Sequence, residues 1–400
     1  MVSKFSDREI REESSHRQGG GSSDPVGVKV RKTKSPKNRL KCIYTNLDGI
    51  GNKINELKSI ISDENPDLIV ITETKASDLL PSNIIFDTSN FKVYRKDRKD
   101  QDGRGVLGGG VAILVKKDLN SNDVTVYNLN NHGAEESVWC EISLKGNRGL
   151  IVGSIYRTPS SLSANNEQIC DLLRCADRLS GDKQLLVCGD FNFNSVVWEE
   201  NRVDREGYNV AQAEIILEAT NDCHWHQHVG EWTHLRDTDN PSRLDLIFSK
   251  NEHDVRNIRY EAPLGMSKHA VLVFNTYVSD IEKLSSKCPR YNFHKGDYVK
   301  FKDLLLGVDW EQEFEGKSTY EKWDRFLHYY RKFVDECVPT YIPRDKLDAP
   351  KWMNRRVKAF IAQKRAAWRR YRSRKCPARR MAYNCVRNSV SLEIRKAKRE

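Results

Sequence analysis

The chain has 400 residues and a formal net charge of +11, and its 10 cysteines include no Cys-x-x-Cys pair. This length suits one large domain with extensions and allows a sizeable core without disulfides. Residues 1–20 are charged and contain no apolar h-region, and no apolar run in the sequence reaches the length of a membrane span. We therefore expect an intracellular, reduced protein of the nucleus or cytoplasm, with no membrane partner.

Residues 1–39 combine charges with a Gly/Ser stretch and have no periodic apolar positions, so we expect a disordered tail. From Leu40 onward, apolar runs typical of buried strands alternate with polar segments. The runs at 40–49 and 67–74 each carry polar residues at their ends. These polar residues are Asn46, Asp48 and Glu73.

Residues 184–192 show the same pattern in its sharpest form, because the apolar run stops abruptly at an acid and an amide. We interpret Gly189 as the point where the backbone turns. Residues two apart in an extended segment point to the same side, which places Asp190 and Asn192 at one site. A carboxylate can hold or deprotonate a water, and an amide can donate to a developing oxyanion. Taken alone, the segment is equally compatible with an ordinary polar turn.

Three further runs, at residues 153–159, 242–248 and 266–271, also carry polar groups. Together, six strand-linked polar groups follow one another between residues 40 and 277. This set resembles the endonuclease/exonuclease/phosphatase superfamily. The resemblance implies an α/β fold, a four-layer sandwich of two packed mixed sheets flanked by helices, with the active site along one edge of the sheets.

The individual motifs are similar to those of the endonuclease domain of jockey-like non-LTR retrotransposon polyproteins. The motifs are Tyr44-Thr45-Asn46, Thr72-Glu73-Thr74, Gly109-Gly110-Val111-Ala112-Ile113, Tyr156-Arg157-Thr158-Pro159, Gly189-Asp190-Phe191-Asn192 and Leu244-Asp245-Leu246-Ile247. Residues 350–354 and the basic stretch after them resemble the connector to the reverse transcriptase, but no Tyr-Ala-Asp-Asp motif follows. We expect the front part of such a polyprotein, truncated before the polymerase, or a decayed or domesticated copy.

The resemblance implies a site for Mg²⁺ or Mn²⁺, in keeping with the preference of these ions for hard oxygen ligands. Glu73 would be the principal metal ligand, with Asn46 and Asp48 beside it. Asp190 would orient or deprotonate the water, and Asp245 would hold the imidazole of His269 toward the transition state. The residues implied to contact the substrate phosphate are Tyr156, Asn192 and Thr233.

One position departs from the family pattern, in which the last motif reads Ser-Asp-His. This chain has Ser267-Lys268-His269. A Lys ammonium near a divalent cation costs on the order of several kcal/mol at an effective dielectric of about 20. Three alternatives follow: Lys268 turns to solvent, it substitutes for part of the metal's charge near the phosphate, or it impairs activity.

The basic character of the chain is concentrated at its end. Residues 351–400 contain 18 Lys/Arg and only 2 Asp/Glu, so the preceding residues are slightly acidic overall. Apolar positions at helical spacing predict a helical connector at 279–350 and a basic helical pair at 351–400. Two compatible interpretations of this pair are a phosphate-binding surface and a docking element for an absent downstream domain.

The sequence therefore predicts a Mg²⁺-dependent endonuclease that nicks DNA to leave a 3′ hydroxyl for target-primed reverse transcription. DNA is the expected partner, with the element's RNA as a second candidate. Two alternatives stay open. One is a catalytically inactive nucleic-acid-binding remnant, for which Lys268 is the main argument. The other is a small-molecule phosphatase of the same fold, against which the basic tail argues.

Overall fold

The structure is a computed structural model. It describes residues 38–76, 81–98, 108–124, 129, 134, 136–146, 148–207, 209–235, 241–279, 281, 290–341 and 352–399. The tail expected to be disordered lies outside these residues, except for Asn38 and Arg39, which open the first strand.

One six-stranded sheet has the order β13-β14-β1-β2-β4-β3. Its strands are β1 (Asn38–Asn46), β2 (Leu68–Thr72), β3 (Phe91–Lys96), β4 (Val111–Lys116), β13 (Val255–Glu261) and β14 (Val271–Val278). The sheet is mixed, because β1 and β2 are parallel while the other neighbours are antiparallel. Asn38 lies opposite Val278, so the first and last strands of the sandwich are paired near the middle of this sheet.

The second six-stranded sheet has the order β11-β12-β8-β7-β6-β5. Its strands are β5 (Ser121–Asp123), β6 (Ser137–Leu144), β7 (Arg148–Tyr156), β8 (Gln184–Asp190), β11 (His226–Gln227) and β12 (Asp245–Ser249). This sheet is also mixed, with β7 and β8 parallel. A β-carbon at Gly189 would lie 2.2 Å from the Ile155 carbonyl oxygen. Gly189 is thus a strand residue that permits a close approach, and the predicted turn at this position is wrong.

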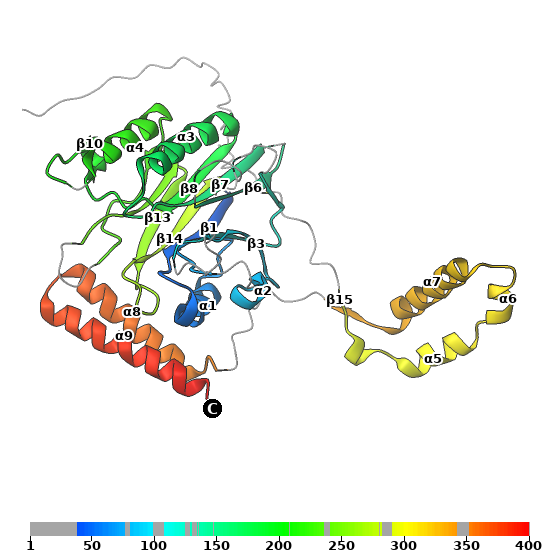
Figure 1. Ribbon diagram of the computed structural model, residues 1–400. Helices are drawn as coiled ribbons and strands as arrows, with labels where there is room; N and C mark the ends of the chain where they lie inside the picture. Colours follow the sequence, from blue (N-terminus) through cyan, green and yellow to red (C-terminus); the bar gives the residue numbers. More distant parts are fainter. Residues whose placement is uncertain are drawn as a thin grey trace, which may run out of the picture. The chain divides into compact units, whose positions relative to one another are not determined.

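The two sheets pack face to face through apolar side chains such as Cys42, Val70, Val152 and Leu186. Two helices, α1 (Ile54–Glu64) and α2 (Ser82–Ile85), pack on the outer face of the first sheet. Two more, α3 (Ser163–Ser180) and α4 (Val210–Asp222), cover the outer face of the second. These four layers, visible in Figure 1, confirm the predicted α/β sandwich. A small hairpin, β9 (Val196–Val197) and β10 (Arg202–Val203), lies beside α4.

The segment at 290–341 is helical, as the periodicity predicts. Its helices are α5 (Tyr298–Leu306), α6 (Trp310–Phe314) and α7 (Thr319–Cys337). Two short strands, β15 (Arg290–Tyr291) and β16 (Thr340–Tyr341), pair at its two ends. Ser318 and Glu321 form a capping box that begins α7, because each side chain satisfies a backbone N–H of the other residue.

The basic extension forms a helical pair, α8 (Arg355–Ser373) and α9 (Pro377–Ala397), which we call the basic hairpin. Apolar residues hold the two helices together, including Val357 and Ile361 of α8 and Val390 and Ile394 of α9. None of the helices in the described part of the chain combines the length and the apolar character needed to cross a membrane.

The basic hairpin packs on the sandwich itself. The Lys364 ammonium lies 2.5 Å from the Glu56 carboxylate, and both side chains are buried. The Trp368 indole donates to the Tyr260 carbonyl at 3.1 Å. The Arg372 guanidinium packs on the rings of Trp232 and Tyr260, 4.1 and 4.4 Å from their centroids. The side of α8 that carries Lys364 and Trp368 therefore packs on the sandwich of this same chain. One of the two expectations was that the helical pair docks to an absent downstream domain.

Candidate active site

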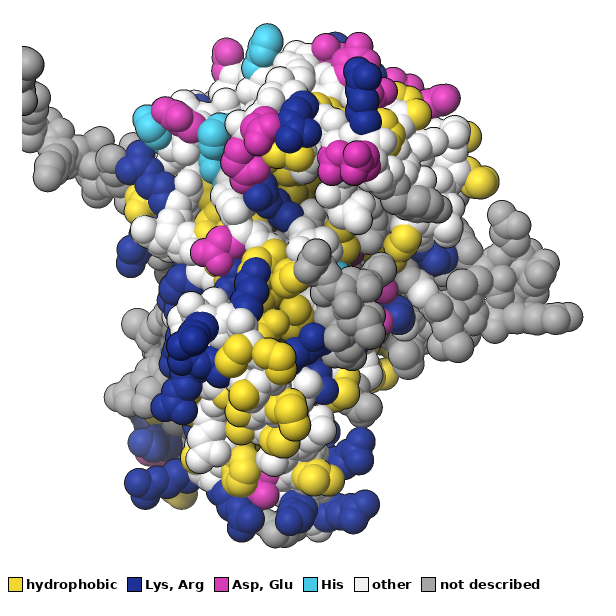
Figure 2. Space-filling view, turned by 90° about the vertical axis from the view of Figure 1, so that its left-hand side faces the viewer, with side chains coloured by type: hydrophobic (Ala, Val, Ile, Leu, Met, Phe, Trp, Pro, Cys, Tyr) yellow, Lys and Arg dark blue, Asp and Glu magenta, His cyan; other side chains and the backbone are white. Residues whose placement is uncertain are grey.

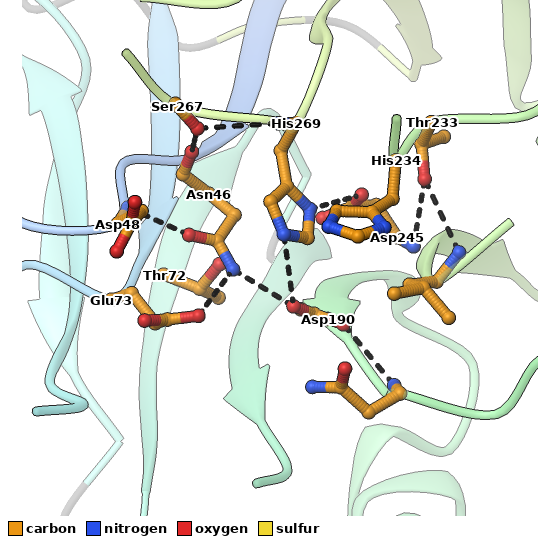
Figure 3. A network of polar contacts seen from close by, with 12 residues as sticks. Asn46, Asp48, Thr72, Glu73, Asp190, Thr233, His234, Asp245, Ser267 and His269 are labelled. Carbon is orange, nitrogen blue, oxygen red and sulfur yellow. Dashed lines mark hydrogen bonds and ion pairs between the residues drawn. The ribbon is translucent and has the colours of Figure 1, made fainter. Parts of the chain in front are cut away.

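Both parallel strand pairs end at the same edge of the sandwich, and this edge carries the candidate site. Asn46 ends β1, and Glu73 directly follows β2. The Asn46 amide donates to Glu73 Oε1 and to Asp190 Oδ2, each at 2.8 Å. It thereby joins the two sheets at this edge, as Figure 3 shows.

The second sheet contributes two aspartates. Asp190 ends β8 and Asp245 begins β12, and the register of these strands places the two residues opposite each other. Both are buried, with 1% and 0% exposure. Asp245 Oδ1 accepts a hydrogen bond from the Tyr44 hydroxyl at 2.8 Å, and Asp245 Oδ2 lies 2.8 Å from His269 Nδ1.

His269 lies in the loop before β14 and reaches both aspartates, since its Nε2 is 3.9 Å from Asp190 Oδ2. Among the described residues, Glu73, Asp190 and His269 form the one His/Cys/Asp/Glu group with ligand atoms all within 4.8 Å. We call Asn46, Glu73, Asp190, Asp245 and His269 the rim cluster (Figure 3). The structure thus brings five of the predicted site residues into one network.

The pKa values of three residues in the rim cluster, Asp190, Asp245 and His269, are shifted from their usual ranges. Burial, together with the neighbouring Asp245, raises the pKa of Asp190 to about 8, although His269 counteracts this. Burial opposes the charge of His269, but the Asp245 carboxylate outweighs burial and raises the pKa of His269 to about 9. The charge of His269 in turn keeps the pKa of the buried Asp245 low. An imidazolium beside a carboxylate with a raised pKa is suited to acid–base chemistry near neutral pH.

Three predicted site residues adopt left-handed backbone conformations, which non-glycine residues seldom do. The φ angles of Asp48, Glu73 and Asn192 are 47°, 50° and 53°. Backbone strain of this kind concentrates at functional sites. For Asn192, this conformation differs from the extended geometry that the sequence suggested, because β8 already ends at Asp190.

Asn192 consequently does not continue the extended backbone of β8. Its backbone N–H donates to Asp190 Oδ1 at 3.1 Å, which folds the chain back at the strand end. Its side-chain amide donates to the Arg157 carbonyl at 2.6 Å. An amide nitrogen carries two hydrogens, so the second can still serve a phosphoryl oxygen.

The structure places Thr233 and Tyr156 in supporting positions. Thr233 is fully buried, and its hydroxyl accepts from the backbone N–H groups of Leu244 and Asp245 at 3.2 and 3.1 Å. It therefore supports Asp245, which differs from the expected contact with the substrate. The Tyr156 hydroxyl is hydrogen-bonded to Glu73, and burial raises its pKa.

Asp48 lies outside the group of close ligand atoms and is held by two lysines. The Lys75 ammonium is 2.5 Å from Asp48 Oδ1 and 3.5 Å from Glu73 Oε2. The Lys53 ammonium is 3.6 Å from Asp48 Oδ2. Burial opposes the charge of Asp48, but Lys75 and then Lys53 outweigh it and lower the pKa of this carboxyl.

The rim cluster fits a divalent cation on chemical grounds. Glu73, Asp190 and Asp245 provide three carboxylates, against the imidazolium of His269 and the Lys75 ammonium beside Glu73. Burial, together with the neighbouring Asp245, raises the pKa of Asp190. Carboxylate oxygens at Glu73 and Asp190, with Asp48 nearby, are hard ligands of the kind that Mg²⁺ and Mn²⁺ prefer.

Five supporting residues were not assigned a role from the sequence, namely Tyr44, Lys53, Thr72, Lys75 and Ser267. The Tyr44 hydroxyl contacts Thr72 at 3.0 Å as well as Asp245, and the Ser267 hydroxyl donates to the Asn46 carbonyl at 3.0 Å. Tyr44 could have been found from its spacing, because it lies two residues before Asn46 and shares its side of the strand. The partners of the lysines depend on turns that no local pattern indicates.

Residues 43–280 match the model of the Endonuclease/Exonuclease/phosphatase family. No curated protein matches the chain.

Three similar solved structures differ in activity. The endonuclease domain of TRAS1, a telomere-specific non-LTR retrotransposon, is 18% identical, with 61% of this chain and 100% of that chain covered and a TM-score of 0.47. The 3′-5′ exonuclease NExo from Neisseria meningitidis is 14% identical, with 60% and 100% covered and a TM-score of 0.46. The AP endonuclease LMAP from Leishmania major is 14% identical, with 60% and 88% covered and a TM-score of 0.47.

Proposed function

Because the chain belongs to the endonuclease/exonuclease/phosphatase family, we propose that it is a Mg²⁺-dependent endonuclease that nicks DNA. The product would carry a 3′ hydroxyl that primes reverse transcription of a non-LTR retroelement. The observation that carries this proposal is the arrangement of Asp190 and His269. A buried carboxylate with a raised pKa lies 3.9 Å from an imidazole that Asp245 keeps protonated.

The reaction is a hydrolysis in which the oxygen of a water forms a bond to phosphorus, the bond to the 3′ oxygen breaks, and the released 3′ oxygen takes up a proton from solvent. Asp190 holds the water and takes its proton, because its pKa of about 8 lies near the working pH. His269, protonated up to a pKa of about 9, faces the negative charge that develops on the phosphoryl oxygens. The product ends are a 3′ hydroxyl and a 5′ phosphate.

Glu73 is the principal residue that would hold Mg²⁺, with Asn46 and Asp48 beside it. The bound ion supplies neutralisation of the phosphoryl charge. Tyr156 and Asn46 fix the orientation of Glu73 through hydrogen bonds, so the carboxylate needs little reorganisation when a ligand arrives. Asn192 would donate its second amide hydrogen to a phosphoryl oxygen.

The retroelement role is supported by the motif set between Tyr44 and Ile247 and by the basic hairpin. Figure 2 shows Lys and Arg side chains gathered over the lower part of one face, at the level of α8 and α9. Such a surface suits a polyanion and is not required for a small phosphoester. For this role we expect a location in the nucleus or cytoplasm, with reduced cysteines.

A plasmid-nicking assay tests the proposal. The wild-type protein should convert supercoiled plasmid to the open circle in Mg²⁺ and not in EDTA, and Glu73→Ala should abolish this conversion. Glu167→Ala, which removes an exposed glutamate from α3, is the matched control and should nick like the wild type. The nicks should be extended directly by a DNA polymerase, which requires a 3′ hydroxyl.

Three results would refute the proposal. Nicks that need phosphatase treatment before extension would exclude the priming role. Hydrolysis of p-nitrophenyl phosphate without plasmid nicking would identify a small-molecule phosphatase, and DNA binding without any hydrolysis would identify an inactive binding protein.

A further inference from the structure

A cavity of about 80 Å³ lies where the basic hairpin meets the loop before His269. Its basic lining comes from both sides of this contact. Lys268 belongs to the loop, whereas Arg380 and Arg387 belong to α9. Tyr383 and Asn384 of the same helix also line it. The cavity is large enough for a group with several oxygen atoms, since about 10–15 Å³ of such space accommodates one water.

The lining offers hydrogen-bond donors and no opposing acid. None of the described residues that line the cavity is Asp or Glu. The Tyr383 hydroxyl and Arg387 Nε are buried and lack a hydrogen-bond partner within the described structure, and Tyr383 is only 2% exposed. Buried polar atoms without partners are uncommon in folded proteins and call for a ligand or another physical explanation.

Within the described residues, no ion pair joins the Arg387 guanidinium to a carboxylate. The nearby carboxylate of Glu56 is already paired with Lys364 at 2.5 Å, so these two charges offset each other. Arg387 therefore adds a positive charge to the wall, alongside Lys268. Guanidinium groups match the geometry of phosphate oxygens through paired N–H donors.

Lys268 links this cavity to the rim cluster. On one side of it, the Ser267 hydroxyl donates to the Asn46 carbonyl, and on the other, His269 pairs with Asp245. The Lys268 side chain is exposed and lines the cavity, and no ion pair joins it to Asp48 or Glu73 in the described structure. Of the three alternatives for Lys268, this arrangement matches the one in which the side chain turns away from the metal.

We propose that the cavity is a phosphate subsite, in which Lys268 and Arg387 bind a backbone phosphate of the DNA beside the cleaved bond. This inference rests on the proposed function for the identity of the ligand. It also gives the departure from Ser-Asp-His a positive role. An Asp at this position would add a carboxylate to the cavity that Arg387 lines and offset its charge, whereas Lys268 adds a second positive charge.

DNA binding measured without cleavage tests the subsite. Fluorescence anisotropy of a labelled duplex in EDTA, at several KCl concentrations, gives the slope of log affinity against log salt. Lys268→Gln and Arg387→Gln should each lower affinity about tenfold and reduce the slope by about one, because each removes one phosphate contact. Arg395→Gln removes an exposed arginine of α9 that does not line the cavity, and its effect should be smaller.

A charge reversal separates this role from the alternative in which Lys268 impairs the metal site. Lys268→Asp should weaken DNA binding more than Lys268→Gln does, because it adds a carboxylate to the wall. Slopes and affinities of Lys268→Gln and Lys268→Asp equal to those of the wild type would overturn the subsite. Lys268 is exposed, so these variants should fold, which thermal unfolding checks. Failure of Mg²⁺-dependent nicking would refute the proposed function alone, since binding is measured without metal.

Discussion

The rim cluster and the contact between the basic hairpin and the sandwich both bury charged groups, but they balance them differently. At the hairpin, one ammonium faces one carboxylate, Lys364 and Glu56, and both are buried. In the rim cluster, the carboxylates of Glu73, Asp190 and Asp245 face the imidazolium of His269 and the Lys75 ammonium, so one carboxylate is in surplus. A buried ion pair neutralises both charges and joins two elements of the fold. A buried charge in surplus costs free energy unless a further ligand neutralises it. The comparison separates a structural contact from a binding site.

The largest effect is expected at the rim cluster. Asp190→Ala should lower the rate of DNA nicking about 10³-fold or more, because it removes the group that takes the proton of the water. The free energy of unfolding should not fall, since the substitution relieves repulsion between buried carboxylates. Nicking kinetics and urea unfolding measure the two quantities, with Asp171→Ala on the exposed face of α3 as the control. Full activity in Asp190→Ala would contradict the assignment.

A substitution at the hairpin contact should have the opposite effect to Asp190→Ala, lowering stability while leaving activity nearly unchanged. Lys364→Ala should lower the free energy of unfolding by about 3–5 kcal/mol, because it leaves the Glu56 carboxylate buried without a partner. The nicking rate per folded molecule should stay close to that of the wild type. Urea unfolding measures the loss, and Lys358→Ala, at an exposed position of α8, should change stability by less than about 0.5 kcal/mol.

A double replacement makes the interpretation of Lys364 sharper. Glu56→Leu with Lys364→Met removes both charges and fills the space with apolar groups, so it should recover most of the lost stability. If the double variant is as unstable as Lys364→Ala, the loss comes from packing and the ion pair is not its cause.

A smaller effect is expected from replacing Asp245, whose carboxylate holds the imidazole of His269. His269 acts as a cation, so its raised pKa keeps the site active up to about pH 9, above which activity should fall about tenfold per unit. Asp245→Asn removes the carboxylate that raises this pKa. The alkaline limb of the pH–rate profile should therefore move to lower pH, and nicking at pH 8.5 should fall about 10–100-fold. An alkaline limb that stays in place would show that His269 does not carry the required proton.

The strands and their polar ends were predictable from local patterns in the sequence, whereas the four-layer arrangement was expected from the resemblance to the superfamily. Apolar runs that stop at Asn46, Glu73 and Asp190 give strands whose ends meet at one edge. The conformation of Asn192 was not predictable, because it depends on a turn closed by Asp190. The buried role of Thr233 depends on β12, which is distant in sequence.

The position of the basic hairpin could not be predicted from the sequence, for a related reason. Periodicity shows that α8 has an apolar stripe, but it does not show which surface covers the stripe. Glu56 lies more than 300 residues before its partner Lys364, so the ion pair that identifies this surface has no local signal. The same holds for the cavity beside Lys268, whose walls come from two parts of the chain.

The pairing of β1 with β14 has a consequence for how the protein is made. β1 pairs with β2 on one side, but on the other side Asn38 to Tyr44 find their partners only in residues 272–278. The first strand of the sandwich therefore waits for its last strand. Contacts this distant in sequence form late and slow folding. Until then, one edge of β1 stays open, and Asn46 at the end of β1 stays apart from His269. We therefore expect a nascent chain that stops before β14 to be bound by chaperones or degraded, without hydrolytic activity.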